Sequence, residues 1–223
     1  MEIKPIAHIY TDFSEKFGIP RQSGLVKGLK GRIVFEKEYR IKEALREIES
    51  FSHLWLIWHF SEANGWHPTV RPPRLGGNKR VGVFASRSPF RPNALGLSCV
   101  KLETVEYDLP DSPSLVVSGV DILDGTPIFD IKPYIPVSDC QADALEGYTA
   151  YTKQYSIEVD FPEDLLNNVP IEKREALIDV LENDPRPGYD EDPSKKYGLT
   201  FAGFDIGFYV RDGVLHVIRA EKL

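Results

Sequence analysis

The stretch His53–Phe60 reads HLWLIWHF and carries two interleaved sets of large side chains. Its even-numbered residues are Leu, Leu, Trp and Phe, and its odd-numbered residues are His, Trp, Ile and His. Because successive side chains of a strand point to opposite faces, both faces of this stretch are bulky. The pattern predicts a central strand of a sheet that is covered on both sides.

Short apolar segments bounded by Gly, Pro, Asp or Ser flank this stretch on both sides, which is the pattern of strands and turns. We expect strands at Pro5–Tyr10, Gly31–Phe35, Arg80–Ala85, Leu95–Val105, Ser114–Val120 and Ile128–Ile135. Apolar residues at helical spacing predict one helix among them, Ile41–Ser50. Many short strands with one helix predict a mainly β fold, with a small β-barrel as the N-terminal domain over residues 1–140. The strand–helix alternation of a doubly wound fold is absent.

The character of the sequence changes after Ser138. Residues 141–155 are polar and are expected to link the barrel to a small α+β C-terminal domain over residues 156–223. A helix is predicted from Pro170 to Glu182, with the proline in its first turn. Two strands, Phe204–Val210 and Val214–Ile218, are expected to form a hairpin through the turn Arg211-Asp212-Gly213.

The 223 residues have a formal net charge of -7 and contain two cysteines, Cys99 and Cys140. Neither cysteine has Cys or His neighbours at metal-ligand spacing, so we expect no metal site. The sequence has no apolar run long enough to span a bilayer, and its N-terminus lacks the layout of a signal peptide. We expect a cytoplasmic protein with no membrane contact.

Positive charge is concentrated between Ala63 and Leu102, where seven Lys or Arg residues occur without any Asp or Glu. Prolines and paired glycines in this window exclude one long helix and indicate loops. Fixed positive charge among Trp66, Phe84 and Phe90 predicts an anionic partner, most simply a nucleic acid. The alternative is a solvated basic face without a partner.

Three segments have the residue types of a binding site. Pro20-Arg21-Gln22-Ser23-Gly24 is a turn that presents a cation and an amide, or else a plain loop. The segment 82–93, GVFASRSPFRPN, holds Arg87 and Arg91 on a proline-stiffened loop, and arginine suits a carboxylate or phosphate. Asp121–Pro127, DILDGTP, places carboxylates, a hydroxyl and backbone N–H groups together, or forms an ordinary Asp-Gly turn.

The residues alone leave three classes of function open: an enzyme that uses a ribose-containing cationic cofactor, a non-catalytic RNA- or nucleotide-binding module, and a hydrolase of phosphorylated small molecules. No dinucleotide or triphosphate motif is present. The carboxylates of DILDGTP favour a cationic cofactor over bare phosphate, which they would repel.

Six motifs occur in a fixed order: PRQSGLVK, FSHLW, RPPRLGGN, GVFASRSPFRPN, LDGTPIFDIKPY and DPRPGY. Together they resemble the TsaA-like family, and within it the bacterial tRNA (adenine-N6)-methyltransferases. The resemblance implies a β-barrel methyltransferase of the non-Rossmann kind that uses S-adenosyl-L-methionine and is a homodimer. It also implies methylation at N6 of threonylcarbamoyl-adenosine, next to the anticodon of tRNA.

The resemblance also implies which residues bind the cofactor: Pro20, Arg21, Gln22, Phe60, Ser61, Arg87, Leu97, Asp121, Leu123, Asp124, Gly125 and Thr126. Arg87 or Arg21 would pair with the cofactor carboxylate, Phe60 and Leu97 would contact its adenine, and Asp121 or Asp124 would accept from its ribose.

The attacking N6 carries a carbonyl substituent and is a poor nucleophile until it loses its proton. The candidate catalytic residues are therefore two carboxylates that could accept that proton and a tyrosine that could orient the base: Asp124, Asp130 and Tyr134.

The candidate RNA contacts are Arg71, Arg74, Lys79, Arg80, Arg91, Arg186 and Tyr189. The last two belong to DPRPGY, whose prolines would hold a guanidinium and a ring toward an anticodon stem-loop. The alternative for DPRPGY is a rigid end to the preceding helix, with Tyr189 packed inward.

Overall fold

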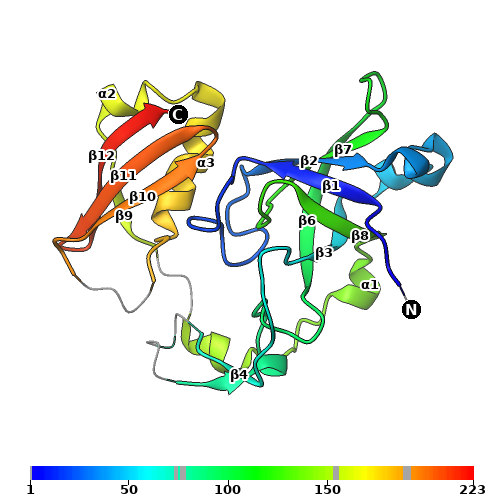
Figure 1. Cartoon of the computed structure of the whole chain (residues 1–223), viewed down its shortest axis with the longest axis horizontal. Coiled ribbons are helices and arrows are strands. Elements are labelled where there is room, and N and C mark those ends of the chain that lie inside the picture. Colours follow the sequence, from blue (N-terminus) through cyan, green and yellow to red (C-terminus); the bar gives the residue numbers. More distant parts are fainter. Residues whose placement is uncertain (1, 73–74, 76–78, 153–155, 188–191) are drawn as a thin grey trace.

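The computed structural model describes residues 2–72, 75, 79–152, 156–187 and 192–223 (Figure 1). Six antiparallel strands close into a barrel in the order β1-β2-β7-β6-β3-β8. This closed barrel confirms the mainly β fold predicted for the N-terminal part. Its strands are β1 (Ala7–Thr11), β2 (Lys30–Phe35), β3 (His53–His59), β6 (Leu95–Glu106), β7 (Ser114–Ser118) and β8 (Thr126–Pro133).

Strand β3 lies between β6 and β8, as the interleaved pattern of HLWLIWHF predicts. Leu54, Leu56 and Trp58 are buried inside the barrel, and the side chains between them are half-buried on its outer face. The pairing with β8 shifts between Ile57 and Trp58, which is a β-bulge. A bulge bends the strand and re-aims its side chains, here at the end of β3 that leads to Phe60.

Two of the predicted elements, one helix and one strand, differ from those in the structure. The helix expected at Ile41–Ser50 is a run of 3-10 turns, Lys37–Tyr39, Lys42–Leu45 and Ile48–Ser50. Glu47 has φ +66°, a left-handed conformation that interrupts any continuous helix. The strand expected at Arg80–Ala85 ends after two residues, because the chain turns into a 3-10 helix at Val83–Ala85.

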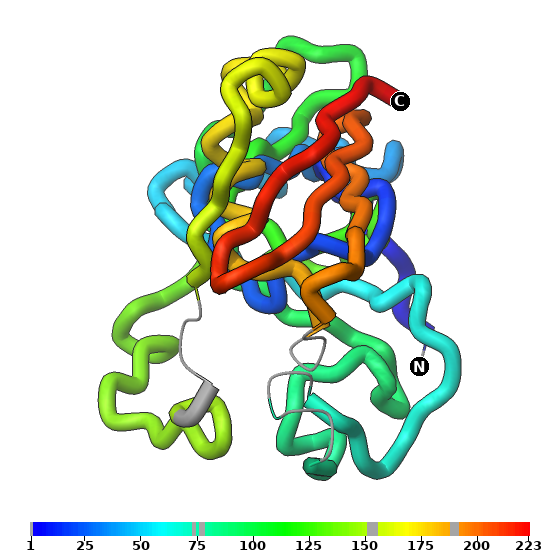
Figure 2. Tube along the Cα trace, turned by 90° about the vertical axis from the view of Figure 1, so that its left-hand side faces the viewer, coloured from blue at the N-terminus to red at the C-terminus, as the bar shows by residue number. Residues whose placement is uncertain are grey.

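Two arms extend below the barrel and the C-terminal domain in Figure 2. One lies between β3 and β6 and contains the short hairpin of β4 (Thr69–Val70) and β5 (Val81–Gly82). The other follows β8 and contains α1 (Pro136–Asp139) and a 3-10 helix at Gly147–Thr152. The first arm carries the basic window of the sequence.

The C-terminal domain is a four-stranded sheet in the order β10-β11-β12-β9 with helices packed on it. The hairpin turn is confirmed, since Asp212 and Gly213 both have positive φ, as this type of turn requires. Strand β10 has no counterpart among the predicted elements. The bounds are β9 (Glu158–Asp160), α2 (Glu163–Leu166), α3 (Ile171–Glu182), β10 (Lys196–Phe201), β11 (Phe204–Arg211) and β12 (Val214–Lys222).

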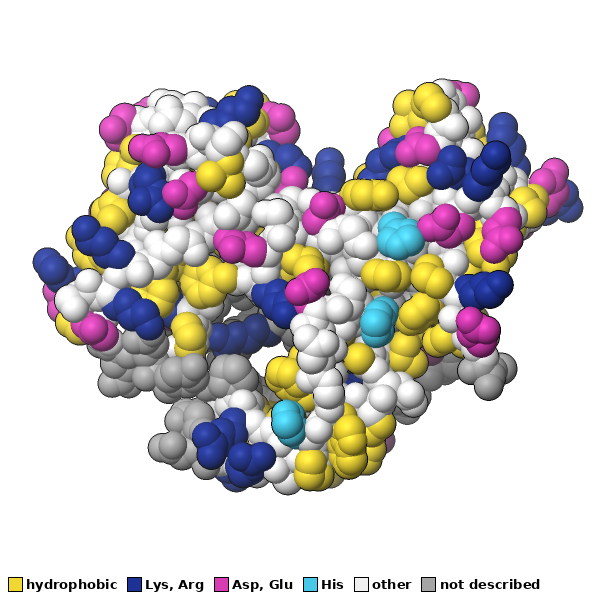
Figure 3. Space-filling view, viewed as in Figure 1, with side chains coloured by type: hydrophobic (Ala, Val, Ile, Leu, Met, Phe, Trp, Pro, Cys, Tyr) yellow, Lys and Arg dark blue, Asp and Glu magenta, His cyan; other side chains and the backbone are white. Residues whose placement is uncertain are grey.

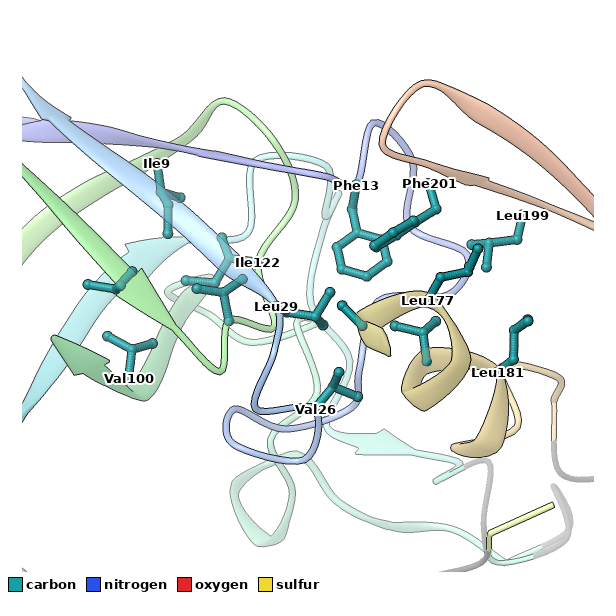
Figure 4. Packing of buried hydrophobic residues seen from close by; sticks show 14 of the residues in the cluster. Ile9, Phe13, Val26, Leu29, Val100, Ile122, Leu177, Leu181, Leu199 and Phe201 are labelled. Carbon is teal, nitrogen blue, oxygen red and sulfur yellow. The ribbon is translucent and has the colours of Figure 1, made fainter. Parts of the chain in front are cut away.

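The barrel and the C-terminal domain share one continuous hydrophobic core (Figure 4). The connection is the loop between β1 and β2, residues 12–29. Its residues Phe13, Val26 and Leu29 are buried and point toward Leu177 and Phe201 of the C-terminal domain. The segment PRQSG, which the sequence nominates as a binding turn, belongs to this loop.

Candidate cofactor-binding site

Strand β7 ends at Ser118, so β6 loses its neighbour on that side before its own first residues are reached. The β1–β2 loop takes the place of β7 there. The backbone N–H of Cys99 donates to Ser23 Oγ at 3.1 Å, and the N–H of Gly24 donates to the carbonyl of Gly119 at 2.9 Å. A side chain at Gly119 would lie 3.3 Å from the Cα of Gly24, so the approach of the two backbones requires glycine.

Asp121 lies beside the same edge of β6 and is held by a buried chain of hydrogen bonds. Ser98 Oγ donates to Asp121 Oδ1 at 2.6 Å, and the indole Nε1 of Trp58 donates to Ser98 Oγ at 2.9 Å. Burial raises the pKa of the Asp121 carboxyl to about 6, although hydrogen bonds from Ser98 and from the backbone of Ser23 oppose this change. Asp121 therefore links the inner face of the barrel to the PRQSG loop.

Arg87 reaches the PRQSG loop from the arm between β3 and β6. Its Nη1 donates to Oε1 of Gln22. The loop that carries Arg87 is fixed by Arg91, whose Nη1 donates to the carbonyls of Val83 at 3.0 Å and Ser86 at 2.7 Å. The structure thus brings together three segments that are distant in sequence: residues 20–24, residues 82–93 and Asp121.

The outer face of the barrel beside this edge has an apolar floor. Leu97 on β6, Ile57 on β3 and Asp130 on β8 stand in one row across three neighbouring strands. Leu97 keeps 53% of its surface exposed, which is high for a leucine on a sheet. Phe60 follows β3 and packs against the barrel core, with its ring centroid 4.2 Å from that of the inward-facing Trp58 and its N–H bound to the carbonyl of Ala94. Ser61 comes next and is exposed.

The remaining predicted site residues lie at the turn before β8 and along the outer face of β8. Asp124 accepts from the N–H of Thr11 at 2.8 Å, next to a cavity of about 340 Å³ between the barrel and the C-terminal domain. Asp130 forms an ion pair with Lys132 at 2.9 Å on the outer face of β8. Tyr134 follows on that face, with its ring 5.8 Å from Trp55, and burial raises the pKa of its hydroxyl.

The rest of DILDGTP forms the turn into β8. Thr126 is buried and donates its hydroxyl to the carbonyl of Leu123 at 2.7 Å, and Gly125 has φ +72°. Within the PRQSG loop, Pro20 is buried. Arg21 is exposed and donates to the backbone carbonyl of Arg186 at 2.9 Å. The ordinary Asp-Gly turn, which is the alternative to a binding site for this segment, is thus present at Asp124-Gly125. Asp121 lies three residues before it.

The candidate RNA contacts are divided between the arm and the C-terminal domain. Arg71, Lys79 and Arg80 are exposed on the arm, and Arg80 also donates to Thr69 Oγ1 at 2.7 Å. Figure 3 shows Lys or Arg side chains at the edge of an opening between the arm and the two domains. Arg74 and Tyr189 lie outside the described residues. Arg186 directs its guanidinium to Asp184, at 2.8 Å for each of two hydrogen bonds.

Ser23, Ser98 and Trp58 hold the site together, and sequence reasoning did not select Ser98 or Trp58 for it. A signal for Ser98 does exist: it is a small polar residue at an inward position of an alternating strand, where a buried hydroxyl requires a partner. Trp58 gives no such signal, because its indole also fits an ordinary apolar core position.

Two other properties bear on the class of site. Among the residues that the structure describes, no group of three or more His, Cys, Asp or Glu side chains is placed to hold a metal ion. No helix in the described ranges is long and apolar enough to cross a membrane.

Comparison with known proteins is consistent with this geometry. Residues 8–140 match the model of the tRNA-methyltransferase O N-terminal domain, and residues 154–223 match that of the TrmO C-terminal domain. The tRNA (adenine(37)-N6)-methyltransferase of Escherichia coli K12 is 39% identical over 99% of this chain and 97% of its own length. A protein of Pseudomonas aeruginosa named a putative S-adenosylmethionine-dependent methyltransferase is 38% identical, over 97% of this chain and 96% of its own.

A solved structure of TrmO from Pseudomonas aeruginosa superposes with a TM-score of 0.82 at 32% identity, covering 100% of this chain and 97% of that one. Both halves of the chain therefore match the same group of proteins, in sequence and in fold. The chain belongs to the tRNA-methyltransferase O (TrmO) family.

Proposed function

We propose that this chain transfers a methyl group from S-adenosyl-L-methionine to N6 of threonylcarbamoyl-adenosine at position 37 of tRNA, in the cytoplasm. The name of the Escherichia coli relative supports adenine 37 and N6. The motifs that resemble the TsaA-like family support the threonylcarbamoyl group. The observation that carries the proposal is the meeting of residues 20–24, Arg87 and Asp121 at the edge of β6 that β7 does not reach.

The residues at this edge suit the chemical groups of S-adenosylmethionine. Arg87 provides a guanidinium for the carboxylate, and its bond to Gln22 fixes the direction in which it is presented. The exposed side chain of Leu97 and the ring of Phe60 provide apolar surface for adenine. Of the two candidate acceptors for a ribose hydroxyl, Asp121 stands at this edge and accepts from Ser98, whereas Asp124 lies away from it and accepts from the N–H of Thr11.

When bound, S-adenosylmethionine supplies a methyl group on a sulfonium, which reacts by in-line displacement. The chain contributes chiefly by positioning, because holding two reactants in line can account for about 7–11 kcal/mol of a barrier. Asp130 shares its row of the barrel face with Leu97, and Asp124 does not. We assign Asp130 to accept the proton of N6, and Tyr134, further along the same face, to orient the adenine.

The assembly belongs to the same proposal. We propose a symmetric homodimer, because a second copy would cover apolar side chains that one copy leaves in water. Four such exposed side chains belong to the arm and the start of β6: Trp66, Phe84, Phe90 and Leu95. The tRNA anticodon stem-loop is proposed to meet the basic arm.

Two measurements test the function. Calorimetry with S-adenosylmethionine should show saturable binding to the purified chain. Nucleoside mass spectrometry should then show one added methyl group on threonylcarbamoyl-adenosine, and no product on tRNA that carries unmodified adenosine at position 37. Binding without methylation of any tRNA would favour the alternative, a non-catalytic RNA- or nucleotide-binding module. Methylation of unmodified adenosine 37 would remove the threonylcarbamoyl part of the proposal.

Arg87→Ala should weaken binding of S-adenosylmethionine by about 1.5–3 kcal/mol, because a hydrogen bond to a charged group is lost. Arg46→Ala removes an exposed arginine from the 3-10 turns after β2 and should leave the affinity unchanged. Calorimetry on both folded variants makes the comparison. Equal affinities for the two variants would remove Arg87 from the site.

A further inference from the structure

The cofactor loop, residues 18–24 between β1 and β2, is folded against the C-terminal domain as well as against the barrel. At its entry, the N–H of Ala202 donates to the carbonyl of Asp12 at 2.9 Å, and Lys173 forms an ion pair with Asp12 at 2.6 Å. The ring of Phe13 packs edge-on against that of Phe201, with centroids 5.5 Å apart. The loop therefore leaves β1 already attached to the C-terminal domain.

Gly18 shows how closely the loop approaches β10. A Cβ at this position would lie 2.1 Å from Cδ1 of Leu199, and the φ of Gly18 is +91°. Any side chain there would collide with a buried leucine and would also disfavour the backbone conformation. The position of residues 19–24 is thus set by β10 on one side.

The other side is set by the turn after α3, which contains Asp184 and Arg186. The guanidinium of Arg186 is bound by both carboxylate oxygens of Asp184 at 2.8 Å, and both side chains are only 12% exposed. Asp184 has φ +47°, a conformation that Asp and Asn tolerate better than most residues. This partly buried pair holds the turn in one shape, and the carbonyl of Arg186 then accepts from Arg21 Nη2 at 2.9 Å.

We propose that the Asp184–Arg186 pair is a positioning element for the cofactor loop, which makes the C-terminal domain part of the cofactor-binding apparatus. The pair fixes the carbonyl that binds Arg21, Arg21 precedes Gln22, and Gln22 orients Arg87. A cavity of only about 30 Å³ lies between the loop and the end of α3, and it is lined by Gly18–Arg21 on one side and by Val180 and Asn183–Pro185 on the other.

This role replaces RNA contact as the proposed task of Arg186. A phosphate would have to compete with the Asp184 carboxylate, which already occupies the guanidinium fork of Arg186 through two hydrogen bonds. The proposal rests on the assignment of residues 20–24 to the cofactor, and its test therefore includes a measurement that needs no cofactor.

Asp184→Asn is the sharpest variant, because it keeps the size and the left-handed tolerance of the side chain and removes its charge. The matched control is Asp205→Asn, which breaks a second Arg–Asp pair among the described residues of this domain, to Arg219 at 2.7 Å, on the sheet. In the full chain, Asp184→Asn should weaken S-adenosylmethionine about tenfold by calorimetry, the size of one lost hydrogen bond. Asp205→Asn should not change it.

Steady-state kinetics separate positioning from RNA contact. Asp184→Asn and Arg186→Ala should raise the KM for S-adenosylmethionine and leave the KM for tRNA within about twofold, and Arg186→Lys should recover part of the loss. A rise in the KM for tRNA alone would overturn the proposal in favour of RNA contact.

Hydrogen exchange without any cofactor gives the independent readout. The amides of Ser23 and Gly24 should exchange about tenfold faster in Asp184→Asn than in the wild type or in Asp205→Asn. Unchanged exchange would overturn the positioning role. If the wild type does not bind S-adenosylmethionine but exchange still responds, the proposed function fails and the mechanical link remains.

Discussion

The buried carboxyl of Asp121 makes the stability of the folded chain depend on pH. This carboxyl is enclosed by Ser98, by the PRQSG loop and by the end of β7, and burial raises its pKa to about 6 from an ordinary value of 3.8. The folded state therefore binds a proton in a pH range where the unfolded state has released it. Stability contributed by the protonated form is present below about pH 4 and is lost as the pH rises to about 6.

Replacing Asp121 with Asn should remove this dependence. An amide keeps an oxygen for the Ser98 hydroxyl and does not titrate, so the stability difference between variant and wild type should grow in favour of Asn as the pH rises from about 4 to about 6. Denaturant unfolding of both proteins across this range measures the difference. A constant difference would mean that the carboxyl is as well solvated in the folded chain as in the unfolded one.

Some single residues of the site could be predicted from their type, because they are charged or stand in a turn that contains glycine. Arg87 and the PRQSG loop were nominated by residue type, and the structure places Arg87 on Gln22. The division between Asp121, Asp124 and Asp130 could not be predicted, because it depends on a β-bulge and on the early end of β7. Neither leaves a clear mark in the residues themselves.

Among the elements, β6 matters most, because it borders both the barrel core and the site. Strand β6 pairs with β3 along its first half, and with β7 along its second half on the opposite edge. The PRQSG loop lies against the part of that opposite edge that β7 does not reach. Close packing on its inner face keeps it in register. The indole of Trp58 fills the space beside Gly96, where a Cβ would lie 2.2 Å from the ring.

Gly96→Ala should therefore destabilise the fold by about 1–3 kcal/mol or more, since a methyl group would displace the ring that holds Ser98. Gly82→Ala is the matched control, because a Cβ there meets no atom within 4 Å and the backbone is already extended. Its effect should stay within about 0.5 kcal/mol. Similar melting temperatures for the two variants would show that Trp58 can move at little cost.

The spacing of apolar residues did not predict every element correctly. The segment Ile41–Ser50 has apolar residues at helical spacing, yet a left-handed Glu47 divides it into short turns. Helical spacing is thus a weak guide by itself, because one residue in the left-handed region is enough to end a helix. By contrast, the alternation in HLWLIWHF reflects burial on two faces, which the barrel imposes directly, and it predicted β3 correctly.

For the molecule as a whole, the salt dependence of RNA binding tests the basic arm. Neutralising Arg71 and Lys79 together should flatten the plot of log affinity against log salt by about one unit per charge, because fewer counterions are released. Lys37→Ala, an exposed lysine of the 3-10 turns that follow β2, should leave the slope unchanged. Filter binding over a range of salt provides the slopes. Unaltered slopes for the arm variants would place the RNA elsewhere.

The homodimer gives a second prediction at this scale. Phe84 is 75% exposed on the arm, and Phe84→Glu should shift the sedimentation coefficient toward that of a monomer. Ile171→Glu alters a residue that is 78% exposed on α3 and should leave the dimer intact. A wild type that sediments as a monomer at micromolar concentration would refute the proposed assembly.

The shared core sets an order of events during synthesis. Phe13 packs on Phe201, and Asp12 binds the N–H of Ala202, so the first and last parts of the chain must meet. A ribosome releases the barrel strands long before these partners. On a nascent chain that ends at residue 140, the β1–β2 loop would lack β10 and the turn after α3. If the loop holds the methyl donor as proposed, a nascent chain would acquire this competence only once the turn after α3 and β10 have been synthesised and folded.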